Sequence, residues 1–286
     1  MSERVAVIGG TGLYLLEEMK SQREVNIETP FGRPSDSIIV GEIGGVEVAF
    51  LSRHGRGHKY SPSTIPYRAN IFALKQLGVR RIISVSAVGS MKEEVAIGVP
   101  VIVDQFIDAT KQRQSTFFDN GIVVHCSLAD PCCPALRRLL IESASKISMK
   151  VLEKGTYVCI EGPQFSTRAE SFMYRAMGVD VIGMTNVTEA KLAREAEVCY
   201  ATIALPTDYD CWHQGHEDVS VGSVVDNLNR NIEKARKLIK QAISDIGNIG
   251  ACECDKALAS AIITAPNAIG QEVKQRLGLL LHKYVG

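Results

Sequence analysis

Residues 158–210 read VCIEGPQFSTRAESFMYRAMGVDVIGMTNVTEAKLAREAEVCYATIALPTDYD. Three short apolar runs, at 158–160, 179–184 and 199–205, alternate with two segments, 168–177 and 189–197, that have helical spacing or the composition of a helix. Strands that alternate with helices form a largely parallel sheet, and ligands of such sheets bind beyond the carboxyl ends of the strands. This stretch places Met184, Thr185, Asp208 and Asp210 at such ends. We therefore expect a functional site there, because a plain loop needs no pair of carboxylates after a buried strand.

Composition and charge narrow the class of protein. The 286 residues are 45% hydrophobic and 22% charged, and 32 basic side chains balance 32 acidic ones. This is the composition of a soluble globular protein, and it gives no reason to expect nucleic acid or a membrane as a partner. The chain runs directly into an apolar strand without a basic leader, and no apolar run is long enough to cross a bilayer. We expect a cytoplasmic protein that binds a small molecule.

The rest of the chain continues the α/β pattern. Strands are expected at 5–8, 81–88 and 99–103, a hairpin at 38–51, and helices at 66–77, 135–145, 220–246, 255–263 and 270–284. Residues 109–133 form a long polar insertion, and such insertions usually carry function or cover an interface. The sequence shows no internal repeat and no linker. We therefore predict a single α/β domain over 1–286, with a core at about 4–246 and a C-terminal helical extension at about 247–286.

Three strand ends have residues suited to an anion. The loop at 9–12 (GGTG) is a phosphate cradle or a plain tight turn, and it lacks the spacing of a dinucleotide fingerprint and the lysine of a P-loop. Arg53 and His54 follow a second strand and suit an oxyanion; alone they would be more typical of a solvated basic loop, but this loop and the one at 9–12 could converge on the same sheet edge. Ser86 and Ala87 end a third strand, where small residues admit a ligand or simply pack closely.

Eight cysteines are many for a cytoplasmic enzyme: Cys126, Cys132, Cys133, Cys159, Cys199, Cys211, Cys252 and Cys254. No pair has the Cys-x2-Cys spacing of zinc sites, and the spacing of Cys252 and Cys254 is too tight for the usual metal knuckle. We therefore expect no metal site. Disulfides, as in the cytoplasm of hyperthermophiles, and free buried thiols both remain open.

Taken together, these segments resemble the S-methyl-5′-thioadenosine phosphorylases, within the purine nucleoside phosphorylase family. The matching stretches follow the family's order: 7–13 (VIGGTGL), 29–32 (TPFG), 53–55 (RHG) with His58, 161–166 (EGPQFS), 168–171 (RAES), 184–187 (MTNV) and 207–212 (TDYDCW). The resemblance implies a three-layer α/β sandwich with a twisted, mixed, mostly parallel sheet between helices. It also implies a homotrimer, or a homohexamer of two trimers. The high cysteine content resembles that of disulfide-bearing members from hot environments.

The resemblance further implies an activity, the reversible phosphorolysis of S-methyl-5′-thioadenosine to adenine and 5-methylthioribose 1-phosphate in purine and methionine salvage. Such a pentosyltransferase uses phosphate as a co-substrate and needs no cofactor. The implied phosphate ligands are Thr11, Arg53, His54, Ser86, Ala87 and Thr185. Ser86 stands where many relatives have threonine, and the hydroxyl is kept. The implied nucleoside contacts are Met184 at the ribose, Phe165, Ser166, Asp208 and Asp210 at the base, Val221 at the 5′ group, and His125 lent to that pocket by a neighbouring subunit.

The residues themselves explain the expected chemistry. A protonated Asp208 gives a proton or a strong hydrogen bond to N7 of the departing purine, and two close carboxylates in an apolar pocket raise each other's proton affinity. A carboxylate suits the amine of adenine, whereas a 6-keto group is better matched by an asparagine. Two alternatives remain: a broader purine nucleoside or methylthioinosine phosphorylase, and a nucleoside hydrolase or a non-catalytic nucleotide-binding module on the same fold.

Overall fold

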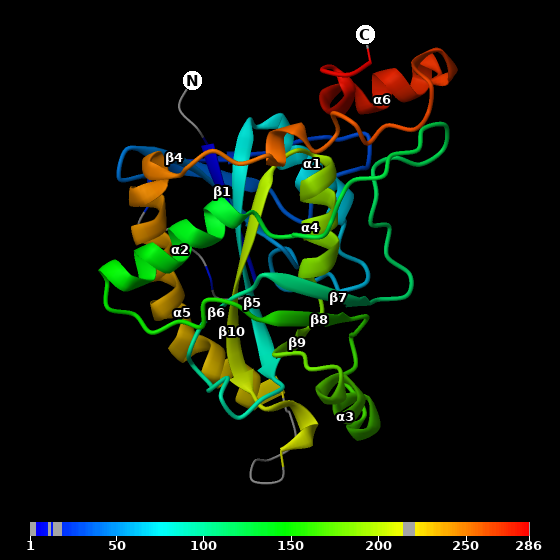
Figure 1. The fold of residues 1–286 in the computed structure, drawn as a ribbon. Coiled ribbons are helices and arrows are strands. Elements are labelled where there is room, and N and C mark those ends of the chain that lie inside the picture. Colours follow the sequence, from blue (N-terminus) through cyan, green and yellow to red (C-terminus); the bar gives the residue numbers. More distant parts are fainter. Residues whose placement is uncertain (1–3, 11–12, 14–18, 214–220, 286) are drawn as a thin grey trace.

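The computed structural model describes residues 4–10, 13, 19–213 and 221–285, without the side chains of 221–226 and 228–230 (Figure 1). The strands are β1 (Arg4–Gly9), β2 (Lys20–Val25), β3 (Ile38–Ile43), β4 (Val46–Ser52), β5 (Val79–Ser90), β6 (Val101–Ile102), β7 (Gln105–Ala109), β8 (Thr156–Ile160), β9 (Val181–Gly183) and β10 (Cys199–Asp208). The helices are α1 (Tyr67–Gln76), α2 (Pro134–Lys146), α3 (Arg168–Ala176), α4 (Asn186–Glu195), α5 (Val221–Asp245) and α6 (Gln271–Leu281).

One mixed sheet organises the described part of the chain. Its strands follow the order β2-β3-β4-β1-β5-β9-β8-β7, and β10 pairs with both β5 and β6. The pairs β1–β4, β1–β5, β5–β10, β7–β8 and β8–β9 are parallel, while β2–β3, β3–β4, β5–β9 and β6–β10 are antiparallel. The predicted α/β fold with a mixed, mostly parallel sheet is confirmed.

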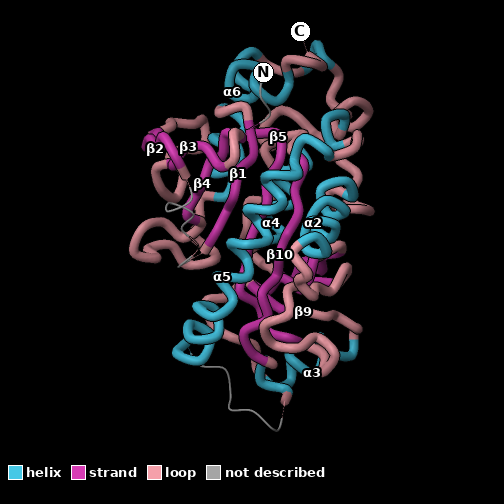
Figure 2. The backbone as a smooth tube through the Cα atoms, turned by 90° about the vertical axis from the view of Figure 1, so that its left-hand side faces the viewer, coloured by secondary structure: helices cyan, strands magenta, loops and turns pink. Residues whose placement is uncertain are grey.

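Side chains alternate between two helical layers, one on each face of the sheet. On β1, Val5 and Val7 join the core cluster that contains the buried faces of α2 and α5. Ala6 and Ile8 point the other way, into the cluster formed with α1, α4 and α6. This period of two is what a strand buried on both faces requires. The layers are seen on opposite sides of the long strands β5 and β10 in Figure 1, and Figure 2 views the molecule from the side of α2 and α5.

Most expected elements are present, and the differences have physical reasons. Strand β2 was not predicted, since its sequence KSQREV is polar and it lies exposed at the sheet edge. Strand β7 was also missed, as it is only half-buried and its sequence QFIDA is short. The helix expected at 255–263 is wrong: Cys254–Lys256 forms one 3₁₀ turn. The backbone beyond it pairs with the insertion instead, through Ala261 O and His125 N at 2.8 Å and Ile263 N and Val123 O at 2.9 Å.

The cysteines do not form disulfides. All eight are free thiols in this structure, so the disulfide reading of the sequence is not supported. The C-terminal extension is held by packing, since Leu277, Leu280 and Leu281 of α6 are buried in the cluster of α1 and α4. In the described ranges, no helix has both the length and the apolar character that a membrane crossing requires.

Candidate active site

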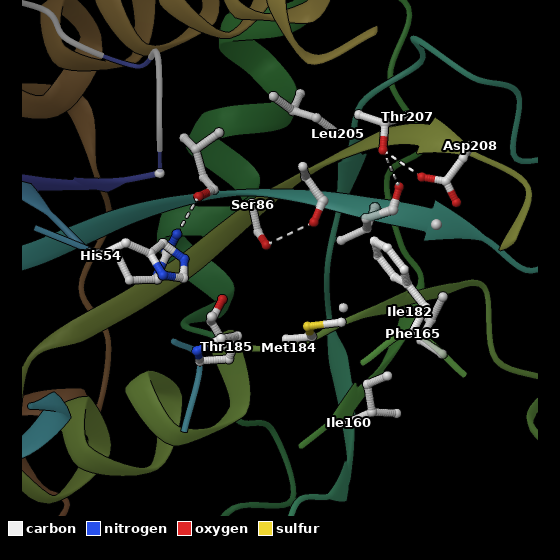
Figure 3. Close-up of a pocket in the computed structure, with 18 of the residues that line it drawn as sticks. His54, Ser86, Ile160, Phe165, Ile182, Met184, Thr185, Leu205, Thr207 and Asp208 are labelled. Atoms are coloured by element: carbon white, nitrogen blue, oxygen red, sulfur yellow. Dashed lines mark hydrogen bonds between the residues drawn. The ribbon is translucent and has the colours of Figure 1, made fainter. Parts of the chain in front are cut away.

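A pocket of about 470 Å³ opens at the carboxyl ends of β1, β5 and β10. This volume suits a nucleoside-sized ligand. Ten of the residues predicted for the site line it: Arg53, His54, Ser86, Ala87, Phe165, Ser166, Met184, Thr185, Asp208 and Asp210. They come from segments far apart in the sequence, and parallel strands bring them to one sheet edge. The polar groups of the pocket separate into two ends, with His54, Ser86 and Thr185 at one and Thr207 and Asp208 at the other (Figure 3).

Arg53 lies beneath the first end, and its side chain is only 1% exposed. Its Nε donates to Oε1 of Glu189 at 2.5 Å and its Nη2 donates to Oε2 at 3.1 Å. Two further bonds run to the carbonyl of Val85 and the hydroxyl of Ser84. Burial alone would lower the pKa of Arg53, but Glu189 raises it above the ordinary value. These bonds leave one Nη1 hydrogen for a ligand, so Arg53 is a rigid donor with a balanced charge.

His54 is neutral at physiological pH. Burial lowers its pKa from 6.5 to about 4, and the nearby charge of Arg53 acts in the same direction. The ring Nδ1 lies 2.9 Å from the carbonyl oxygen of Tyr60. A carbonyl only accepts, so Nδ1 holds the proton and Nε2 presents a lone pair. His54 is therefore suited to accept a hydrogen bond from a protonated phosphate oxygen.

Thr185 joins this end of the pocket to a helix. It is the N-cap residue of α4, and its side chain makes no capping bond. The first N–H groups of a helix and its dipole favour an anion. Below it, the Nδ2 of Asn186 lies 3.0 Å from each of three hydroxyls, those of Ser84, Tyr200 and Thr202. This buried polar layer, which sequence reasoning missed, fixes the residues above it.

Asp208 lies at the other end of the pocket, and burial raises its pKa. Its Oδ2 accepts from the Thr207 hydroxyl at 2.7 Å and its Oδ1 accepts from the Asp210 backbone N–H at 2.9 Å. The charge of Asp210 is a smaller contribution in the same direction. Burial also raises the pKa of Asp210. The expectation of raised proton affinity is met, with burial rather than mutual repulsion as the main cause.

Gly89 of β5 makes room for this carboxyl group. A Cβ atom at position 89 would lie 2.9 Å from the Asp208 Oδ1 atom and 2.9 Å from Ile182 Cγ2. Both approaches are closer than real Cβ contacts allow, so a side chain at position 89 would displace Asp208.

Met184 and Phe165 lie between the two polar ends (Figure 3). The carbonyl of Met184 accepts from Nη1 of Arg113 at 2.7 Å. Arg113 also donates to the carbonyl of Glu161 at 2.6 Å and to the hydroxyl of Tyr67 at 2.9 Å. Its side chain is 1% exposed although it belongs to the polar insertion. Sequence reasoning missed Arg113, since no motif marks it; it positions two segments of the pocket wall.

Three predicted site residues are not placed in this pocket. Thr11 lies outside the described residues, and so does the side chain of Val221 in α5. His125 does not line the pocket of its own chain and is held by its backbone against Ala261. Ser166 does line the pocket, and its buried Oγ has no hydrogen-bond partner within the described part of the chain. A ligand would supply one.

A separate group of residues could hold a metal ion. The Sγ atoms of Cys133, Cys199, Cys252 and Cys254 all lie within 4.8 Å of one another. The spacing of cysteines along the chain gave no sign of this ligand set, because the fold brings it together from three distant segments.

The comparisons with known proteins agree with this geometry. The family model "Phosphorylase superfamily" matches residues 4–244. The chain belongs to this superfamily. Within it, the chain is 52% identical to the S-methyl-5′-thioadenosine phosphorylase of Geobacter sulfurreducens, with 100% of both chains covered.

Two solved structures are similar to this chain in fold as well as in sequence. A methylthioadenosine phosphorylase from an antarctic soil metagenomic library is 52% identical, with a TM-score of 0.93 and coverage of 98% of this chain and 99% of that one. A variant of the Schistosoma mansoni adenosine/methylthioadenosine phosphorylase, in complex with methylthioadenosine, is 33% identical, with a TM-score of 0.83 and 98% of each chain covered. The chain is thus a phosphorylase-superfamily member that groups with the S-methyl-5′-thioadenosine phosphorylases.

Proposed function

We propose that this chain catalyses the reversible phosphorolysis of S-methyl-5′-thioadenosine to adenine and 5-methylthioribose 1-phosphate. The observation that carries the proposal is the pocket with two ends: donors suited to phosphate lie at one end, and a carboxyl group with a raised pKa lies at the other. The two ends face one space, as an attack on one side of a sugar and departure from the other require (Figure 3). The names of the relatives fit this reaction.

At the phosphate end, the protein's role is to hold the nucleophile. The free Nη1 hydrogen of Arg53, the hydroxyls of Ser86 and Thr185 and the backbone at Ala87 would donate to phosphate oxygens, with Thr11 as a further ligand. His54 Nε2 would accept from the protonated oxygen. Donors that are already held in place stabilise charge in the transition state without reorganisation. Phosphate bound there would stabilise the cationic sugar as its bond to the base breaks.

At the base end, the protein's role is to stabilise the leaving group. Asp208 with a proton donates to N7, so adenine departs with less negative charge. Asp210 and the free hydroxyl of Ser166 complete the contacts to the base, and Phe165 packs on its face. Met184 lies where the ribose would be. Inorganic phosphate is the co-substrate of this reaction.

The methylthio end of the pocket is proposed to be completed by a second copy. His125 does not reach the pocket of its own chain, and two apolar side chains of α3 face outward, with Phe172 49% and Met173 51% exposed. Phe165, at the pocket, is 45% exposed as well. A homotrimer, alone or paired as a hexamer, would cover these side chains and bring His125 beside Val221. Heterologous contacts of this kind close into rings.

Product analysis with and without phosphate tests the reaction. The assay uses methylthioadenosine, adenosine and inosine, and we expect adenine from methylthioadenosine only when phosphate is present. Release of base without phosphate would indicate a nucleoside hydrolase, and no release with any substrate would favour a binding module. A specificity ratio of methylthioadenosine over methylthioinosine near or below one would support the broader purine nucleoside phosphorylase.

A further inference from the structure

The four clustered thiols come from three parts of the chain. Cys133 is the N-cap residue of α2, Cys199 begins β10, and Cys252 and Cys254 lie in the segment between α5 and α6. Cys133, Cys199 and Cys254 are buried, and Cys252 is half-buried. Their side chains belong to, or pack against, the core between α2, α5 and the sheet. This site is separate from the nucleoside pocket, since none of the four residues lines that pocket.

The spacing of the sulfur atoms matches a tetrahedral metal site. A zinc ion bound at about 2.3 Å to each of four thiolates places the sulfurs about 3.8 Å apart. The four Sγ atoms lie within 4.8 Å of one another, and those of Cys199 and Cys252 are 3.2 Å apart. A disulfide requires about 2.05 Å between its sulfur atoms. The group is therefore compact enough for one ion and holds its sulfurs as separate thiols.

We propose that these four cysteines bind one zinc ion in a structural site. Four sulfur ligands in tetrahedral reach favour zinc or iron among the common metals, and four protein ligands fill a tetrahedral site, which leaves no open position for catalysis. Zinc has no redox chemistry, so it fits a site whose role is structural. Binding is an exchange: each thiol releases its proton to solvent as its sulfur coordinates the ion.

The surroundings of the cluster suit such an ion. Four thiolates around Zn²⁺ leave two negative charges, and the Nη1 atom of Arg194 lies 4.0 Å from the Cys254 Sγ. The Nη2 atom of the same side chain donates to the carbonyl of Asp130, which holds it in place. A cleft lined by Cys252, Cys254 and Arg194 provides a route from solvent. Hydrogen bonds and nearby charges of this kind orient and tune metal ligands.

The ion would fasten the C-terminal extension to the catalytic core. The segment that follows Cys254 pairs with the insertion through Ala261 and His125, and through a bridge between Val124 and Ile262. Within 249–263 the only helical element is the 3₁₀ turn Cys254–Lys256, which is followed by hydrogen-bonded turns. A cross-link at residues 252 and 254 replaces the regular structure that this segment lacks, and it stabilises the backbone that holds His125.

Metal analysis of the intact protein tests the proposal. The chain is expressed in zinc-containing medium, purified, passed through a desalting column with EDTA, and analysed for metals by mass spectrometry. Thiols are then counted after unfolding with a chelator and no reductant. We expect about one zinc per chain and eight titratable thiols. Four titratable thiols without metal would mean two disulfides and would overturn the proposal. Eight titratable thiols with no bound metal would also overturn it, and so would the finding of bound iron instead of zinc.

Two variants separate the site from general cysteine effects. Cys252→Ser removes the most accessible ligand and is expected to lose most of the bound zinc and to lower Tm by about 5 °C or more. Cys126→Ser alters a half-buried cysteine that contacts Ala257 O in the same region but lies outside the cluster. It is expected to keep one zinc. Equal zinc content in the two variants would refute the assignment. If Cys252→Ser folds poorly, the metal count of the wild-type protein still tests the proposal.

Discussion

Arg53 and Glu189 form a bidentate ion pair under the proposed phosphate site, with N–O distances of 2.5 and 3.1 Å and side chains 1% and 2% exposed. The two residues lie 136 positions apart in the sequence. Arg53 follows β4 and Glu189 lies in α4, so the pair ties the sheet to a helix. The charge of Arg53 is therefore already balanced by Glu189 before an anion binds.

Replacing Glu189 by glutamine should unbalance this site in a diagnostic way. The variant leaves Arg53 buried without a counter-charge, and breaking a buried pair costs about 3–5 kcal/mol. Phosphate would then supply the missing negative charge. We expect Glu189→Gln to lower Tm in the absence of phosphate, and the rise in Tm on adding phosphate to exceed that of the wild type. Thermal unfolding across a phosphate titration measures both.

Glu195→Gln is the matched control for this prediction. Glu195 is also a buried glutamate of α4, but it accepts from the Thr116 hydroxyl and the Phe117 N–H and does not line the pocket. Its variant should show the same phosphate-dependent rise in Tm as the wild type. If Glu189→Gln also shows an unchanged phosphate response, Arg53 does not contact phosphate.

Asp208→Asn should separate catalysis from folding. The amide cannot deliver a proton to N7, and loss of one acid–base contribution lowers the rate roughly 10²–10⁴-fold. Burial already disfavours the charged form of Asp208, as its raised pKa reflects. Because the pKa of Asp208 is higher in the folded state than in the unfolded chain, the wild type loses stability as the pH rises through the folded-state pKa. An asparagine does not ionise and so avoids this loss. We expect kcat for methylthioadenosine to fall while Tm at neutral pH does not; a variant with normal turnover would remove Asp208 from this role.

Arg113→Lys tests how the insertion shapes the nucleoside pocket. Lysine keeps the charge but lacks the planar fork that reaches the carbonyls of Met184 and Glu161 together. One lost charge-assisted hydrogen bond costs about 1.5–3 kcal/mol, or roughly 10- to 100-fold in an equilibrium. We expect KM for methylthioadenosine to rise, with KM for phosphate changed much less. The exposed Arg138→Lys is the control, and a parallel rise in both KM values would point to a general loss of structure.

The sequence allowed much of this site to be predicted, for reasons visible in particular residues. Arg53, Ser86, Thr185 and Asp208 each follow an apolar run, so a parallel sheet had to bring them to one edge. Motifs around them then assigned the expected family. The same reasoning could not find Glu189, because a glutamate in a helix-forming segment has the pattern of a solvated face.

Contacts between distant segments could not be predicted. Arg113 lies in an insertion without a period, and its partners are backbone carbonyls, which have no sequence signature. The thiol cluster joins Cys133 and Cys199 to residues more than fifty positions later, so its ligand spacing exists only in space. The expected helix at 255–263 failed for the same reason, since this backbone pairs with the insertion.

The low pKa of His54 predicts a loss of stability in mild acid. The folded state holds the ring neutral down to a pH of about 4, whereas the unfolded chain binds the proton near pH 6.5. Stability from this group is therefore complete above pH 6.5 and is lost as pH falls towards 4, by roughly 3 kcal/mol. Urea unfolding between pH 7 and 4 should show a shallower decline in His54→Gln than in the wild type. Replacing the exposed His282 by glutamine should leave the wild-type decline; equal slopes in all three proteins would contradict a buried neutral His54.

The outward face of α3 leads to a prediction about assembly. Its buried residues are Ser171 and Tyr174, whereas the apolar side chains of Phe172, Met173 and Met177 are about half exposed. A cluster of large apolar side chains on one helix face marks an interaction site. A second apolar pair, Val123 and Ile263, lies beside His125 and is also exposed. Two unlike apolar surfaces on one chain suit the heterologous contact of a ring.

Met173→Asp should therefore dissociate the oligomer. A carboxylate at this face cannot be buried without a partner, so we expect the variant to sediment as a monomer while the wild type sediments as a trimer or hexamer. The monomer would lack the His125 of a neighbour, so its KM for methylthioadenosine should rise more than its KM for adenosine. Lys240→Asp, at an exposed position of α5, introduces a carboxylate elsewhere on the surface and should leave assembly intact. A wild-type chain that sediments as a monomer with full activity on methylthioadenosine would show that His125 has no role in the site.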